Sequence, residues 1–128
     1  MDEKVLYWIE LAEYDLETAK AMFETKRYLY VGFMLHQTIE KILKGYYINN
    51  IKGMPPFIHS LIRLAQKASI YDGFSEAQKE LLDVLEPLNI EARYPDHKER
   101  LLIYLDSARC IKLIEETEAM FKWIKEKL

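Results

Sequence analysis

Cysteine, glycine and proline are scarce in this 128-residue chain, and each shortage excludes a class of protein. A single cysteine, Cys110, allows no internal disulfide bond, which argues against a secreted disulfide-stapled domain. Four glycines and four prolines are too few for a loop-rich β-sandwich. The glycines are also isolated from one another, so they cannot build a phosphate-binding loop.

A long apolar run and a basic leader are also missing. No window approaches the roughly 20 apolar residues that a bilayer-spanning helix needs, which excludes an integral membrane protein. Met1 is followed by Asp2 and Glu3, where a secretory signal would carry basic residues. We therefore expect a cytoplasmic protein without membrane association.

Metal-binding spacing is absent as well. A ferritin-like site needs a Glu three positions before a His on each of two helices. A zinc site needs several closely spaced Cys and His ligands, and this chain has one cysteine and three scattered histidines. The histidines are His36, His59 and His97, and the third position before each holds Phe33, Pro56 and Tyr94 in turn. We expect neither a metal ion nor another cofactor.

The charge balance limits the contacts that nucleic acid can make. A formal net charge of −3 argues against a protein that coats nucleic acid non-specifically, because that mode needs an excess of Lys and Arg. The charges are uneven, however. The segment before Lys20 is acidic, whereas Arg93, His97, Lys98 and Arg100 form a basic cluster. A nucleic acid would meet this cluster.

Apolar residues recur every three or four positions along the chain, the spacing of amphipathic helices. Helices are predicted from Asp2 to about Lys26, from Tyr28 to about Asn50, from about Ser60 to Ser69, from Ser75 to Ala92, and from Asp106 or Ser107 onward. Ser75 and Gln78 have the form of a capping box, Pro87 should kink its helix, and a short turn is expected over 97–103 after Asp96. The pattern predicts an all-α, up-and-down bundle of four main helices plus short helices, in one domain over 1–128.

Four polar residues of the second helix, Gln37, Glu40, Lys41 and Lys44, are three or four positions apart and should share a face. A solvated charged surface, a structural or dimer-interface network and a ligand site are all compatible with this spacing. His36 stands at the edge of the apolar stripe, where a polar side chain needs partners. His59, which follows the prolines of the next loop, fits a helix cap, a buried hydrogen bond or a ligand contact.

A second segment rich in polar side chains is Asn89-Ile90-Glu91-Ala92-Arg93-Tyr94-Pro95-Asp96-His97. The simplest interpretation is a turn, because Pro95 disfavours helical geometry at Tyr94 and Asp96 is suited to cap a following helix. The alternative interpretation is a binding or catalytic site.

Together these stretches resemble the HEPN family, the higher eukaryotes and prokaryotes nucleotide-binding domains, along essentially the whole chain. The matching elements, in the family's order, are Trp8 with Ala12-Glu13-Tyr14-Asp15-Leu16, then Gln37-Thr38-Ile39-Glu40-Lys41-Ile42-Leu43-Lys44, His59-Ser60-Leu61 and Arg93-Tyr94-Pro95-Asp96. The last is the R-Y-P-D motif of one branch. Each element alone is weak, but the four in order are fairly specific.

The resemblance implies a helical bundle that dimerises, with the motif residues of both subunits facing a shared cleft. Such domains are often encoded beside a minimal nucleotidyltransferase in toxin–antitoxin pairs. Many are metal-independent ribonucleases that carry Arg, four to six residues and His, whereas others bind nucleotides or are accessory. Here only three residues separate Arg93 from His97, and Glu99 replaces a frequent aromatic residue.

The first hypothesis is therefore a nucleotide- or RNA-interacting module. Arg93 would hold a phosphate with its planar fork, Tyr94 would stack on a base or hold the dimer, and Asp96 would accept a ribose hydroxyl or orient Arg93. The other expected ligand-binding residues are Gln37, Glu40, Lys41, Lys44 and His59.

Two further hypotheses remain. A metal-independent endoribonuclease would use His97 as acid or base and Arg93 for the phosphorane charge. Alternatively, the R-Y-P-D turn is only a scaffold. An exposed Arg93–Asp96 ion pair would stabilise the fold by under about 1 kcal/mol, so stability alone explains these residues poorly.

Overall fold

The computed structural model describes the backbone of residues 1–91 and 95–128 and the side chains of residues 1–89 and 100–128. Its elements are α1 (Glu3–Glu24), α2 (Tyr28–Asn50), α3 (Leu61–Lys67), the 3-10 turn η1 (Tyr71–Gly73), α4 (Glu76–Leu85), α5 (Leu88–Glu91), α6 (Pro95–Tyr104) and α7 (Ser107–Lys125). The predicted all-α bundle is confirmed. In this described part, none of the helices has the length and apolar character that crossing a membrane requires.

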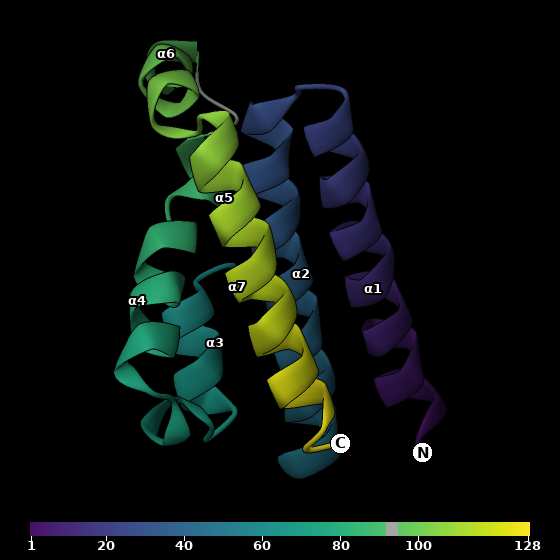
Figure 1. The fold of residues 1–128 in the computed structure, drawn as a ribbon. Coiled ribbons are helices and arrows are strands. Elements are labelled where there is room, and N and C mark those ends of the chain that lie inside the picture. Colours follow the sequence, from purple (N-terminus) through teal and green to yellow (C-terminus); the bar gives the residue numbers. More distant parts are fainter. Residues whose placement is uncertain (92–94) are drawn as a thin grey trace.

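The second helix is the centre of the bundle. It contacts each of the other six α-helices, and Figure 1 shows α1, α2 and α7 as long neighbouring rods with α5 and α6 at one end. Two glycines allow the close approaches. A Cβ at Gly32 would lie 3.0 Å from Leu88 and 3.1 Å from Leu105, and a Cβ at Gly45 would lie 3.3 Å from the Trp8 Cβ.

Local signals set several helix ends. The capping box is present: Ser75 Oγ accepts from the Gln78 N–H at 3.1 Å, and the Gln78 side chain accepts from the Ser75 N–H at 2.9 Å. Asp106 caps α7 by accepting from the Arg109 N–H at 2.8 Å. Each bond satisfies a backbone N–H that has no partner within its own helix.

Two expectations about prolines are wrong. Pro87 ends a helix instead of kinking one, since α4 stops at Leu85 and α5 is a separate short helix from Leu88. Proline has no N–H to donate and its ring clashes with the preceding turn. Pro95 begins α6, so a ten-residue helix replaces the turn expected over 97–103. Proline suits the first helical position, where no N–H is needed.

Candidate functional site

Glu40 is the centre of a polar cluster between α2 and the segment before α3. The Glu40 residue is only 4% exposed and Lys44, one helical turn later, is 7% exposed. The Lys44 ammonium donates to Glu40 Oε2 at 3.1 Å, and His59 Nδ1 lies 3.1 Å from Glu40 Oε1. A single buried carboxylate therefore binds a buried cation and an imidazole.

His59 is the solvent-facing member of this cluster, because its side chain is 64% exposed. When Nδ1–H donates to Glu40, the other ring nitrogen, Nε2, is the proton acceptor of the neutral imidazole. A buried carboxylate that orients an exposed imidazole gives a group that can accept or donate a proton at a fixed position. The structure thus brings Lys44 and His59 together on the two oxygens of Glu40.

His36 lies behind Glu40 with no exposed surface. Its Nδ1 is 3.9 Å from Glu40 Oε1, and neither ring nitrogen has a hydrogen bond within the described residues. Burial lowers the pKa of His36 to about 4, although the negative charges of Glu40 and Glu86 oppose the shift. His36 is therefore neutral at neutral pH and is sealed away from any ligand.

Glu86 fixes the segment that carries His59, and no local sequence pattern indicated this role. From the end of α4 its carboxylate accepts from Ser60 Oγ at 2.5 Å and from the Leu61 N–H at 2.8 Å. The Glu86 side chain thus caps α3 from 25 residues away, in addition to the local cap that Ser60 gives to the Arg63 N–H. The start of α3, and with it His59, is tied to the bundle.

The other two polar residues of α2 face different neighbours. The Lys41 ammonium binds the buried Asp15 carboxylate of α1. The Gln37 amide donates to Asn89 of α5 at 3.0 Å. The four residues expected to act together are therefore spread over three contacts, and of the four only Glu40 contacts His59, while Lys44 joins the cluster through Glu40.

The R-Y-P-D motif lies mainly outside the described residues. This applies to Arg93 and Tyr94 entirely and to the side chains of Asp96 and His97, whose backbone forms the first turn of α6. The neighbouring helices α5 and α6 both pack on α2. The Gln37–Asn89 contact brings the start of this region within one helical turn of Glu40.

A cavity of about 700 Å³ adjoins the cluster on its other side, and Lys44 is one of its lining residues. Trp8 lines the same cavity, and the Lys44 ammonium lies 5.5 Å from the centre of the Trp8 ring. Sequence reasoning missed the cavity, because it joins the ends of α1 and α2 to the loop after α2. Among the described residues no group of three or more His, Cys, Asp or Glu side chains has the geometry of a metal site.

Comparisons with known proteins agree on the fold. The sequence profile of the HEPN domain matches residues 5–128. The crystal structure of TT1696 from Thermus thermophilus superposes with a TM-score of 0.84 at 21% identity, covering 99% of this chain and 100% of the other. At that identity the likeness extends to the fold alone. No curated protein sequence gives a significant match.

Proposed function

This chain belongs to the HEPN domain family, and from that premise we propose that it is a nucleotide- or RNA-interacting module that acts as a homodimer. We further propose that it pairs with a minimal nucleotidyltransferase in a toxin–antitoxin type system. Its ligand site would combine the Glu40, Lys44 and His59 cluster with the side chains of the R-Y-P-D motif. A reading frame for a small nucleotidyltransferase beside this one would support the pairing.

The observation that carries the proposal is the buried ion pair with an exposed imidazole. A buried pair such as Glu40–Lys44 adds little net stability compared with two apolar side chains, because both charges lose their hydration. Stability therefore explains its presence poorly. Orientation of His59 toward a ligand explains it better, and Arg93 in the neighbouring motif offers the planar fork that suits a phosphate.

Exposed apolar side chains support self-association near the motif. Ile103 of α6 is 80% exposed, and Leu102 of α6 and Ile111 of α7 are also exposed. Apolar groups gathered on a surface commonly mark a protein interface. A second copy seated on α6 would bring two R-Y-P-D motifs toward one cleft.

The alternative function, a metal-independent endoribonuclease, is favoured by one feature of the cluster. His59, oriented by Glu40, adds a second imidazole to the Arg93 and His97 side chains on which that hypothesis rests. RNA cleavage through the 2′-hydroxyl needs both a base and an acid, and two imidazoles can supply them.

The test is equilibrium binding of short single-stranded RNA, in excess EDTA, to the wild type and to Arg93→Ala. We expect Arg93→Ala to weaken binding by about tenfold or more, since one charge-assisted bidentate contact with a phosphate is lost. Thermal unfolding should be nearly unchanged. Arg63→Ala, which removes the same charge from the exposed surface of α3, is the matched control and should bind like the wild type.

The same samples separate the outcomes. Sedimentation equilibrium should give twice the 15.3 kDa mass of one chain. Cleavage of the RNA that is lost in both Arg93→Ala and His97→Ala would establish the ribonuclease alternative. A melted Arg93→Ala protein would show that the motif is structural, and equal binding by Arg93→Ala and the wild type would contradict the assignment of the site.

A further inference from the structure

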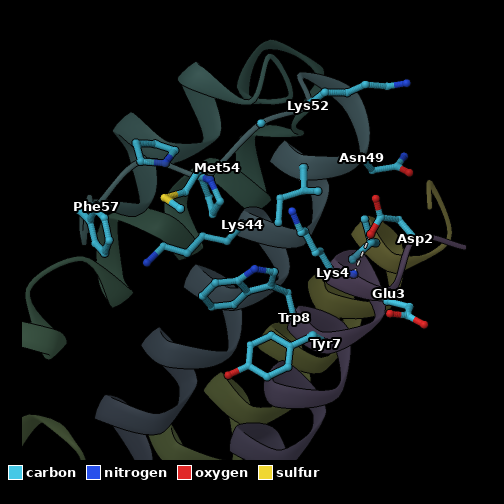
Figure 2. Close-up of a pocket in the computed structure, with 15 residues that line it drawn as sticks. Asp2, Glu3, Lys4, Tyr7, Trp8, Lys44, Asn49, Lys52, Met54 and Phe57 are labelled. Carbon is cyan, nitrogen blue, oxygen red and sulfur yellow. Dashed lines mark hydrogen bonds between the residues drawn. The ribbon is translucent and has the colours of Figure 1, made fainter.

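The cavity beside Lys44 has the size and chemistry of a small-ligand site. Its volume of about 700 Å³ falls within the range of cavities that enclose drug-sized ligands. It lies between the first turns of α1, the last turns of α2 and the loop after α2, as Figure 2 shows. Its walls are mainly apolar, as is usual for such sites, and three lysines are among the polar groups that line it.

Trp8 provides an aromatic surface at this cavity. The ring is only partly buried, so one part of it stays available to a ligand. The start of the Trp8 side chain is held in place because its Cβ packs closely against Gly45. A partly exposed, rigidly held indole that faces a cavity is suited to stack on a flat aromatic ligand.

Lysine side chains line the cavity together with this ring. Lys44 is held over Trp8, and Figure 2 shows the Lys4 side chain extending from the start of α1 toward the same space. Lys52 stands farther out on the loop, and Asp2 and Glu3 are the acidic lining residues. Asp2 already accepts from the Lys4 N–H at 2.7 Å as the cap of α1. Lys44 is already paired with Glu40, so Lys4 and Lys52 are the lining cations that can meet an anionic group.

The loop after α2 is bent so that large apolar side chains stand at the cavity. Lys52 and Gly53 both have positive φ, 67° and 92°, and a left-handed backbone at a lysine costs about 1 kcal/mol or more. Beyond this bend, Phe57 is 91% exposed and Met54 is also exposed, and both line the cavity. Exposed apolar groups at the edge of a cavity are what a bound aromatic ring would cover.

From these contacts we propose that the cavity binds one nucleotide, with its base against Trp8 and its phosphate near Lys4. The ligand is either a free mononucleotide or the 5′-terminal nucleotide of an RNA, which share this chemistry. The proposal rests on the proposed function and deepens it. Because Glu40 binds both Lys44 and His59, the cavity and the candidate site share one carboxylate.

The test uses the full chain and the intrinsic fluorescence of Trp8. The chain has two tryptophans, so Trp123→Phe leaves Trp8 as the only indole. Titration with adenosine monophosphate, and with a short RNA bearing a 5′-phosphate, should change its fluorescence saturably. Adenosine alone and inorganic phosphate alone should each bind more weakly than the monophosphate. If adenosine monophosphate binds more tightly, the ligand is a free mononucleotide. If the RNA binds more tightly, the ligand is the 5′-terminal nucleotide of an RNA.

Calorimetric titration then assigns the contacts. Trp8→Leu should weaken binding by about tenfold, the usual effect of losing one base–aromatic stack. Lys4→Ala should weaken binding several-fold and make it less sensitive to salt. The matched control is Lys127→Ala, whose ammonium lies 4.2 Å from the Trp123 ring and does not line the cavity; it should bind like the wild type. If Trp8→Leu fails to fold, Trp8→Phe and Lys4→Ala decide the result.

The outcomes distinguish this proposal from the proposed function. Binding that is lost in Arg93→Ala but unchanged in Trp8→Leu and Lys4→Ala would overturn the cavity assignment and leave the proposed function standing. Binding that is lost in Trp8→Leu but kept in Arg93→Ala would support the cavity and overturn the R-Y-P-D site. Absence of binding by both the monophosphate and the RNA would overturn both.

Discussion

Replacement of Glu40 with alanine should lower the free energy of unfolding by about 3–5 kcal/mol, an unusually large effect for a single polar side chain. The reason is the charge that remains. Lys44 is buried and its ammonium donates to Glu40, so Glu40→Ala leaves a buried cation without its counter-ion. Urea unfolding at neutral pH measures the loss.

A second substitution separates the ion pair from the packing. Glu40→Ala combined with Lys44→Met removes the orphaned charge as well, and this double variant should recover much of the stability that Glu40→Ala alone loses. Glu17→Ala is the matched control, because Glu17 is exposed and its ion pair with Lys20 is at the surface. Its effect should stay below about 1 kcal/mol. A Glu40→Ala protein as stable as Glu17→Ala would contradict the burial of the ion pair.

Mild acid should destabilise the protein through His36. Its pKa is about 4 in the folded protein and 6.5 in its ordinary state, so below pH 6.5 the unfolded chain binds a proton that the folded chain does not. Stability attributable to His36 is therefore complete above pH 6.5 and falls as the pH drops toward 4. At pH 5 the free energy of unfolding should be about 2 kcal/mol lower than at pH 7.

His36→Leu is the variant that isolates this effect. It replaces the buried imidazole with an apolar side chain, so the part of the pH 7 to pH 5 loss that belongs to His36 should disappear. The variant should also gain stability at pH 7, because two ring nitrogens without hydrogen bonds are removed from the interior. Glu40, Glu86 and His59 are the titratable groups that remain near this position. An equal loss in His36→Leu and the wild type would contradict the assignment.

The predictable parts of this fold are those that adjacent residues determine. Apolar spacing predicted the long helices, and the Ser75 and Gln78 pair predicted the start of α4, because a capping box needs only positions three apart. The two prolines were misjudged for a physical reason. Proline is compatible with both the residue after a helix and the first residue of one, and a single sequence does not say which side is helical at Pro95.

The polar residues of α2 show what helical periodicity does not predict, namely the contact partners of each side chain. Intervals of three and four residues predicted one shared face for Gln37, Glu40, Lys41 and Lys44, yet the side chains of one helical face can contact different neighbouring segments. Lys41 contacts Asp15 of α1 and Gln37 contacts Asn89 of α5. Glu40 contacts His59, and Lys44 donates to Glu40. These partners come from distant parts of the chain, as does the carboxylate of Glu86 that caps α3. No local rule identifies them.

The central claim is that the Glu40 cluster and the R-Y-P-D motif form one ligand-facing site. Its most direct measurement is the backbone amide spectrum of the 15N-labelled full chain during titration with short single-stranded RNA. We predict that the largest shifts occur at residues 37–44, at His59 and at 93–97. Saturable shifts confined to α7, or none at saturating RNA, would contradict the claim.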